Sequence, residues 1–357
     1  MSNAPQDAGA ARKDEGAAPN DEGAARRGAG QADASRAASA AGAPPPPQPP
    51  PPPLAHLHGQ RPPAPAWFEA ALVNTPQRSH FDFEGAAIEL LTWGPRGAPG
   101  LLLLHGNAAH ADWYSFIAPL LADRYRVAAM SFSSMGGSGW RDSYSHTQWA
   151  DEALAAAEHA GLFESSVKPL FVGHSFGGFP LMVACGRYGQ RLAGVVIVDS
   201  PLRDPGQRAE HEKRRGHSPF VSARSYPTKD AAIARFRLIP QQPSEHLYIV
   251  DHIARTSLRD SVDEQGKTVW TWRFDPQRFK HFSFGQPHLE MAQARCPVTL
   301  VRGTLSSLVT PEIWAYAQTQ APAGSAAIEI AGAHHHVMID QPLAFVQLLA
   351  ELRAAAL

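Results

Sequence analysis

A serine flanked by glycines is the feature of the sequence with the clearest chemical meaning. The stretch FVGHSFGGFP, residues 171–180, places Ser175 between Gly173 and Gly177 in the pattern Gly-x-Ser-x-Gly. A serine hydroxyl attacks a carbonyl only when a base takes its proton, a third group orients that base, and N–H donors hold the developing oxyanion. The pattern alone is weak evidence, because glycine and serine are common residues. The other parts of such a site must come from elsewhere in the chain.

Short apolar runs alternate with longer amphipathic stretches on both sides of this motif. Runs bounded by Gly, Pro or polar residues, typical of strands buried on both faces, occupy 100–106, 125–132, 168–175, 194–200, 296–303 and 325–332. An earlier pair, 79–85 and 86–94, looks like a hairpin of strands. Helix-like stretches lie at 111–123, 146–160, 176–189, 311–320 and 342–356. This alternation predicts a mostly parallel sheet with helices on both faces.

Two intervals do not follow this alternation of strand-like and helix-like stretches. Residues 1–66 contain Ala, Gly, Pro and scattered charge but no aromatic residue, Val or Ile, so we expect a disordered N-terminal segment before a single domain over 67–357. The interval 201–287 is rich in Arg, His and Pro and is too long to be a plain loop. It predicts a small helical cap over about 202–287, with 268–274 as a possible strand within it.

The serine motif follows an apolar run and opens a helix-like stretch, and a sharp strand–turn–helix transition requires its glycines. In these features, and in element order from about Phe81 to Leu357, the chain resembles the α/β-hydrolase superfamily. The resemblance implies the α/β class: a mostly parallel eight-stranded sheet flanked by helices, with a helical cap between strands six and seven. It also implies that Ser175 is the nucleophile.

The resemblance extends to two further motifs. LLLLHGNAAH, residues 101–110, resembles the His-Gly loop of relatives, which implies that the backbone N–H groups of Asn107 and Phe176 form the oxyanion hole. His105 would then shape the loop without transferring a proton. GAHHHVMIDQPLAF, residues 332–345, resembles a segment in which the catalytic His lies six residues before Gln-Pro, which implies His335, with His334 and His336 as alternatives.

The third member of the triad is not where relatives usually carry it. The stretch RGTLSSLVTPE has Ser307 where the orienting Asp would fall, and a serine has no charge to stabilise an imidazolium. The fold offers a second position, at the end of the preceding strand, which some members of the superfamily use; here it is occupied by Asp199. We therefore expect Asp199 to be the acid, with Glu312 or a more distant group as alternatives.

Neighbouring residues have structural interpretations. Ser133, Ser138 and Arg141 belong to a loop that resembles one bracing the sheet in relatives. Trp113, Phe176 and Phe179 are candidate walls of the substrate pocket. The three consecutive histidines 334–336 suggest a metal, but consecutive side chains in an extended loop point in different directions, so we expect no metal and no cofactor.

A serine nucleophile implies acyl transfer to water, and the resemblance predicts hydrolysis of a small or medium carboxylic ester through an acyl-enzyme on Ser175. A lactone hydrolase or a carbon–carbon bond hydrolase would use the same triad. The alternative from a different class is a non-catalytic ligand sensor on the same fold, for which the displaced acid is the one indication.

Composition and charge exclude some classes of binding partner and indicate a cellular location. The chain has 357 residues, of which 44% are hydrophobic and 18% charged, with a formal net charge of −1 and no basic run suited to a phosphate backbone. Cys185 and Cys296 are the two cysteines and imply no disulfide framework. The sequence has no apolar run long enough for a membrane span and no secretory signal at its start. We therefore expect a cytoplasmic enzyme with a small-molecule substrate, no nucleic-acid partner, and an oligomeric state that the sequence does not indicate.

Overall fold

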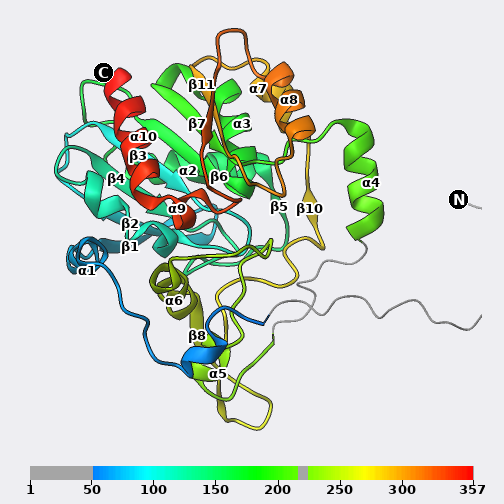
Figure 1. The fold of residues 1–357 in the computed structure, drawn as a ribbon. Coiled ribbons are helices and arrows are strands. Elements are labelled where there is room, and N and C mark those ends of the chain that lie inside the picture. Colours follow the sequence, from blue (N-terminus) through cyan, green and yellow to red (C-terminus); the bar gives the residue numbers. More distant parts are fainter. Residues whose placement is uncertain (1–50, 216–223, 357) are drawn as a thin grey trace, which may run out of the picture. The chain divides into compact units, whose positions relative to one another are not determined.

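The structure is a computed structural model that describes residues 51–215 and 224–356. An eight-stranded sheet with the order β1-β2-β4-β3-β6-β7-β11-β12 forms its centre (Figure 1). The pairs β1–β2 and β2–β4 are antiparallel, and the other neighbours are parallel. The predicted α/β architecture is thereby confirmed. The strands are β1 Gln77–Phe83, β2 Ala86–Trp93, β3 Gly100–Leu104, β4 Arg126–Met130, β6 Leu170–His174, β7 Gly194–Val198, β11 Val298–Gly303 and β12 Ala326–Ile330.

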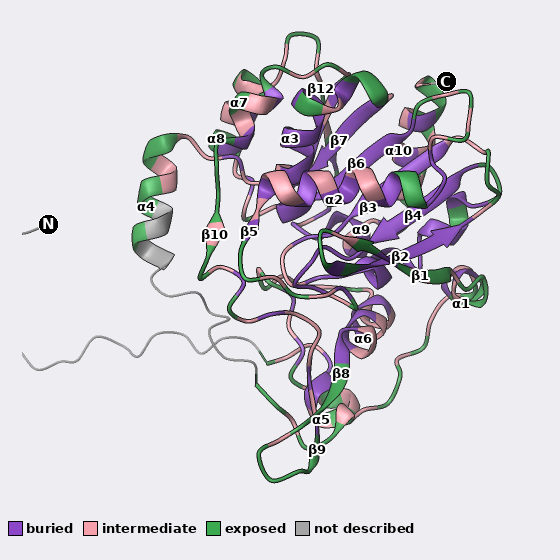
Figure 2. Ribbon diagram, turned by 180° about the vertical axis from the view of Figure 1, so that it is seen from behind, coloured by how far each residue is buried: buried purple, intermediate pink, exposed green. Residues whose placement is uncertain are grey.

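The central strands form because their residues are apolar on both faces. All residues of β3, β4, β6 and β7 are buried, and these strands are purple in Figure 2. Successive side chains of a strand point to opposite faces, so Leu101 and Leu103 enter one apolar cluster while Leu102 and Leu104 enter another. The sheet therefore has a hydrophobic core on each side.

The register of the parallel strands brings the predicted site residues to one edge. Leu104 of β3 pairs with Gly173 of β6, and His174 of β6 pairs with Val198 of β7. Ligand sites of parallel sheets lie at the carboxyl ends of the strands, where loops emerge side by side. Residues that directly follow these strands, such as Ser175 and Asp199, consequently lie at the same edge.

Helices cover both faces of the sheet (Figure 1). Trp149 of α2, Leu181 of α3 and Ile313 of α8 belong to the apolar cluster on one face, whereas Phe68 of α1 and Phe345 of α10 belong to the cluster on the other. No helix in the described ranges combines the length and the apolar character needed to cross a membrane. The bounds are α1 Ala66–Val73, α2 His146–His159, α3 Gly178–Arg187, α8 Pro311–Gln320, α9 Val337–Asp340 and α10 Pro342–Ala355, with 3₁₀ turns η1 Ala55–Leu57, η2 Ala111–Tyr114, η3 Ala118–Leu121, η4 Ser175–Gly177 and η5 Gly189–Arg191.

One predicted helix is wrong. The stretch 111–123 forms the two short 3₁₀ turns η2 and η3 in place of one amphipathic helix. Pro119 has no N–H to donate to a helical hydrogen bond, and the Ser115 hydroxyl donates to the carbonyl of Asp112 at 2.7 Å. Local side-chain bonding and proline therefore interrupt a segment whose apolar pattern suits a helix.

The long interval after β7 contains the predicted cap. Counted within the main sheet, β7 is the sixth strand and β11 the seventh, so the cap lies where the sequence predicts it. The strand predicted at 268–274 is β9, which forms an antiparallel hairpin with β8. The elements of the interval are α4 Pro205–Arg215, α5 Lys229–Ile233, α6 Leu247–Thr256, β8 Leu258–Val262, β9 Thr268–Trp272, β10 Phe282–Ser283 and α7 Pro287–Met291, and β10 pairs with β5 Tyr144–Ser145 of the main domain.

The N-terminal boundary differs from the prediction. The expectation of disorder for residues 1–50 lies outside the described residues, but 51–66 are part of the folded domain. Leu54 is fully buried in an apolar cluster, and Arg255 of α6 donates to the carbonyl of Gly59 at 2.7 Å. Leu54 and Leu57 are the two leucines of the 66-residue segment predicted to be disordered; Leu54 lies in this cluster and Leu57 packs against it. An average over the composition of the whole segment hides this short anchor.

We expect two N-terminal truncations to differ in stability. Removal of residues 1–50 should leave the free energy of unfolding unchanged, whereas removal of residues 1–66 should lower it by about 2 kcal/mol or more, because Leu54 leaves a core site. Denaturant unfolding monitored by circular dichroism measures both. Leu54→Ala in the full chain is the matched control and should reproduce much of the loss. Equal stability of the two truncated chains would contradict the anchor.

Candidate active site

Ser175 lies at a sharp turn between β6 and α3. Its φ is +52°, a left-handed conformation that costs energy for a serine and is held by its surroundings. A Cβ at Gly173 would lie 2.4 Å from the carbonyl oxygen of Gly177, and a Cβ at Gly177 would lie 2.6 Å from that of His105. Both glycines are therefore required sterically. The Ser200 hydroxyl donates to the Ser175 carbonyl at 2.7 Å and fixes the turn from β7.

His335 and Asp199 form a buried pair beside this turn. His335 follows β12, Asp199 follows β7, and 2.7 Å separates His335 Nδ1 from Asp199 Oδ1. The Asp199 side chain has no solvent exposure and that of His335 has 2%. The Gly303 N–H donates to the second carboxylate oxygen, Asp199 Oδ2, at 2.9 Å. Asp199 therefore meets His335 from the strand end that the sequence indicated.

The loop after β11, in which the resemblance places the usual acid at Ser307, contacts Asp199 through the neighbouring Ser306. Ser306 donates from its hydroxyl to Asp199 Oδ1 at 2.6 Å, while its oxygen accepts from the N–H groups of Leu308 and Val309 at 3.3 and 3.1 Å. Ser307 is exposed. The loop after β11 thus supplies a hydrogen-bond donor to the carboxylate of Asp199. Sequence analysis did not assign this role to Ser306.

Ser175, His335, Asn107 and Phe176 all line one cavity of about 880 Å³. Such a volume lies within the range of small-molecule sites in enzymes. Among the described residues no hydrogen bond joins Ser175 to His335, as is common in enzymes without substrate, whose catalytic hydrogen bonds shorten on binding. The wall is largely aromatic and aliphatic, and includes Trp113, Phe179, Leu202, Ile239, Pro240, Phe279, Phe284, Leu308 and Tyr316.

Arg278, which sequence analysis missed, holds the loop that carries Asn107. Its Nη2 and Nε donate to Asn107 Oδ1 at 2.6 and 3.2 Å, and its Nη1 donates to the carbonyl of Asp275 at 2.7 Å. The guanidinium lies 5.0 Å from the ring centre of Phe274 and 4.7 Å from that of Phe279, within the range of cation–π attraction. No local motif marks this arginine, which is 171 residues from Asn107.

We expect Arg278→Lys to lower kcat about tenfold and to leave KM nearly unchanged. A lysine keeps the charge but cannot reproduce the two bonds of the guanidinium to Asn107 Oδ1, so the loop loses its fixed position. Steady-state hydrolysis of an ester, the activity that the sequence predicts, measures the effect. Asn107→Ala, which keeps the backbone N–H, should cause a similar loss, and the double variant should be no worse than either. Additive losses would show that Arg278 acts elsewhere.

The three consecutive histidines lie in different surroundings. His334 bonds with Asp340 through its backbone N–H at 2.7 Å and through Nδ1 at 3.1 Å. The rings of His335 and His336 lie 4.8 Å apart, and both approach His174, which precedes Ser175. Burial, reinforced by the nearby His335, lowers the pKa of His174 and of His336 well below the ordinary value, so both are neutral imidazoles. The predicted divergence of consecutive histidine side chains does not hold for His335 and His336, because the turn into α9 brings their rings together.

Other predicted residues lie outside the cavity. Ser133 accepts from the Trp149 indole at 3.0 Å, Ser138 donates to the Ser131 carbonyl at 2.6 Å, and Arg141 pairs with the buried Glu152 at 3.1 Å. None of the three lines the Ser175 cavity. His105 is buried, and burial lowers its pKa to about 3. Its Nε2 accepts from the Phe132 N–H at 3.1 Å.

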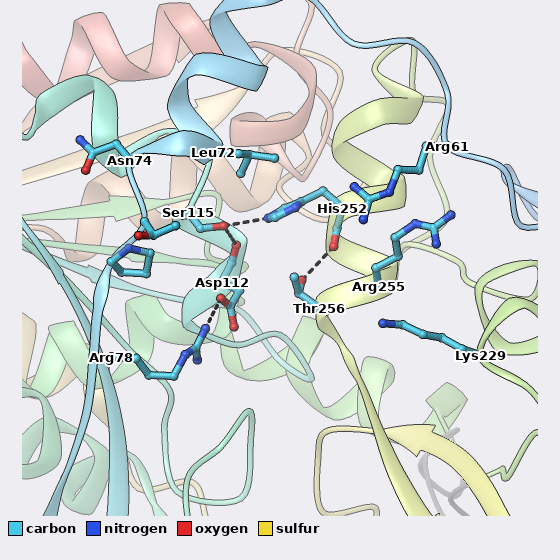
Figure 3. Close-up of a pocket in the computed structure, with 12 residues that line it drawn as sticks. Arg61, Leu72, Asn74, Arg78, Asp112, Ser115, Lys229, His252, Arg255 and Thr256 are labelled. Carbon is cyan, nitrogen blue, oxygen red and sulfur yellow. Dashed lines mark hydrogen bonds and ion pairs between the residues drawn. The ribbon is translucent and has the colours of Figure 1, made fainter.

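A second, smaller cavity of about 390 Å³ lies where α1, β1, η2, α5 and α6 meet (Figure 3). It shares no lining residue with the Ser175 cavity. Arg78 points to Asp112, at 2.6 Å, and the ring of His252 points to the Ser115 hydroxyl, at 2.8 Å. Burial lowers the pKa of His252 to about 4, so this ring is neutral. The second cavity contains none of the residues predicted to do chemistry.

Comparison with known proteins places the whole arrangement in context. Residues 101–348 match the sequence profile of the Alpha/beta hydrolase family. Esterase Rv0045c of Mycobacterium tuberculosis is 26% identical over 292 residues, which cover 79% of this chain and 91% of that protein. One solved structure of the same esterase, whose description mentions transition metal inhibition and structural refinement, has a TM-score of 0.60 at 22% identity. The matched region covers 84% of this chain and 97% of that one. The thioesterase domain from the curacin biosynthetic pathway has a TM-score of 0.63 at 21% identity over 78% of this chain and all of that domain.

Proposed function

The chain belongs to the alpha/beta hydrolase family, and we propose that it is a serine esterase that hydrolyses small or medium carboxylic esters through an acyl-enzyme. The observation that carries the proposal is the buried pair of His335 and Asp199, 2.7 Å apart, in the cavity that Ser175 also lines. The similarity to a named esterase over most of its length supports the same reaction.

In the proposed mechanism Ser175 Oγ attacks the ester carbonyl while His335 Nε2 takes the hydroxyl proton. Asp199 accepts a hydrogen bond from Nδ1–H of His335, which leaves the lone pair on Nε2, and its charge stabilises the imidazolium that forms. The backbone N–H groups of Asn107 and Phe176 donate to the oxyanion. The tetrahedral intermediate then expels the alcohol, which receives its proton from His335, and leaves an acyl group on Ser175.

Deacylation repeats these steps with water as the nucleophile. His335 takes a proton from the water, the second tetrahedral intermediate uses the same oxyanion donors, and the bond to Ser175 Oγ breaks to release the carboxylic acid. No cofactor takes part in this scheme. The Ser306 hydroxyl and the Gly303 N–H donate to the carboxylate of Asp199 and support its charge.

The size and lining of the cavity support the substrate class. An apolar and aromatic wall around about 880 Å³ suits an ester with a short or medium hydrocarbon acyl chain. We expect kcat/KM on a series of p-nitrophenyl esters to be highest for short or medium acyl chains and to fall for long ones. If the unmodified chain hydrolyses none of the esters, lactones and thioesters tested, the result would instead support a ligand sensor.

A further inference from the structure

Three buried histidines meet beside the serine turn, in the cavity that Ser175 lines. One ring nitrogen from each of His174, His335 and His336 can be chosen so that the three atoms lie within 4.8 Å of one another. Three nitrogens around one Zn²⁺ lie about 3.3 Å apart, given bonds of about 2.0 Å. Side-chain rotations that shorten these separations by up to about 1.5 Å would place the three donors around one ion.

The ring of His336 packs against Trp113, with 5.5 Å between the ring centres, but this contact leaves its nitrogens unpaired. Its side chain is buried, yet neither Nδ1 nor Nε2 has a hydrogen-bond partner among the described residues. The backbone of Ile239 approaches the ring and partly offsets the lowering of the His336 pKa by burial, but it forms no hydrogen bond of normal geometry with the ring. Buried polar groups are normally satisfied, so an imidazole with two unpaired nitrogens facing a cavity is unusual. A bound ion would satisfy one of them.

The other two histidines already have the outer hydrogen bonds that metal ligands need. His335 bonds through Nδ1 to the carboxylate of Asp199, and His174 Nε2 lies 2.9 Å from the carbonyl oxygen of His335, to which it donates. A ligating histidine usually donates its far N–H to a carboxylate or a backbone carbonyl, which fixes the tautomer. His335 Nε2 and His174 Nδ1 are thereby left with their lone pairs available.

We propose that His174, His335 and His336 bind one divalent transition-metal ion of the Zn²⁺ type, with water as the fourth ligand, and that this ion inhibits the enzyme. Neutral imidazoles are suitable ligands for such ions, whereas Mg²⁺ and Ca²⁺ prefer oxygen and should not compete. Inhibition follows because the ion occupies the lone pair of His335 that must take the serine proton. This consequence rests on the proposed function, but the binding itself does not.

The binding test uses the full chain with Ser175→Ala, which keeps all three histidines. Titration calorimetry with ZnCl₂ should show one ion per chain that His336→Phe, in the same background, weakens at least about tenfold. His334→Asn is the matched control, because His334 is the adjacent histidine and bonds with Asp340 outside the cluster. Co²⁺ added to the Ser175→Ala chain should give the intense visible absorption of a four-coordinate site. Equal affinity in the His336→Phe chain, or a six-coordinate Co²⁺ spectrum, would overturn the site.

The inhibition test uses chains that retain Ser175. Zn²⁺ should suppress ester hydrolysis, EDTA should restore it, and His336→Phe should raise the inhibitory Zn²⁺ concentration at least about tenfold, while His334→Asn leaves it unchanged. Zn²⁺ that binds but does not inhibit would refute the inhibitory role. If the metal-free chain hydrolyses no ester while the binding results hold, the proposed function fails and the metal site remains.

Discussion

Ser175→Ala should lower kcat for ester hydrolysis by about 10⁴-fold or more and leave the fold intact. An alanine has no nucleophile, and catalysis that remains would come only from binding and from the oxyanion donors. Alanine is tolerated sterically because it occupies less space than serine, although it retains the cost of the left-handed φ of +52°. Steady-state rates on the best p-nitrophenyl ester measure the loss, and circular dichroism checks the fold.

Ser307→Ala is the matched control for this variant. Ser307 is an exposed serine at the position where relatives usually carry the acid. Its replacement should leave kcat within about twofold of the unmodified chain, since surface substitutions away from special features have small effects. If Ser175→Ala kept most of its activity, the nucleophile would be another group and the proposed mechanism would be wrong.

Asp199→Asn should lower kcat by about 10⁴-fold, the second large effect. The asparagine fills the same space but has no charge to stabilise the imidazolium, and its amide can donate to His335 Nδ1. His335 would then carry its proton on Nε2 and could not accept one from Ser175. The measurement is kcat across pH, with Glu312→Gln as the control, because Glu312 is exposed and should have no effect. A large loss in Glu312→Gln with little loss in Asp199→Asn would contradict the assignment.

A relocated carboxylate tests the same point by gain of function. Ser306 Oγ lies 2.6 Å from Asp199 Oδ1, so an aspartate at position 306 brings a carboxylate close to His335 Nδ1. The double variant Asp199→Asn/Ser306→Asp should recover about tenfold or more of the activity that Asp199→Asn loses. Asp199→Asn/Ser307→Asp, with the new carboxylate at an exposed position, should recover less. Equal activity in the two double variants would show that proximity to His335 is not the cause.

The fold could be predicted because short-range patterns determine it, whereas the pairing of Asp199 with His335 was implied by the resemblance to the α/β-hydrolase superfamily. The apolar runs at 100–106, 125–132, 168–175 and 194–200 form fully buried strands, and the carboxyl ends of neighbouring parallel strands meet at one edge. The sequence also predicts burial on both faces for the run at 325–332, but this run forms the edge strand β12 and is largely exposed. The strained turn at Ser175 requires glycines on both sides, so the turn can be recognised from the sequence of residues 171–180 alone. Asp199 could be found because the chain resembles a superfamily in which some members carry the acid at this strand end.

The remaining features depend on contacts between distant segments. Arg278 reaches Asn107 from the far end of the cap, and nothing in its neighbourhood in the sequence indicates that contact. Leu54 anchors a stretch whose average composition favours disorder. His336 meets His174 only because the chain turns sharply into α9. Sequence periodicity carries no information about such pairings, so the proposed metal site and the contact of Arg278 with Asn107 required the structure.

The central claim, that Ser175 is an activated nucleophile, is tested most directly by intact-mass spectrometry after treatment with a fluorophosphonate. The unmodified chain should gain the mass of one phosphonyl group within minutes, Ser175→Ala should gain none, and Asp199→Asn should react far more slowly because His335 is no longer oriented. Labelling of Ser175→Ala at the rate of the unmodified chain, or no labelling of the unmodified chain while it hydrolyses esters, would contradict the claim.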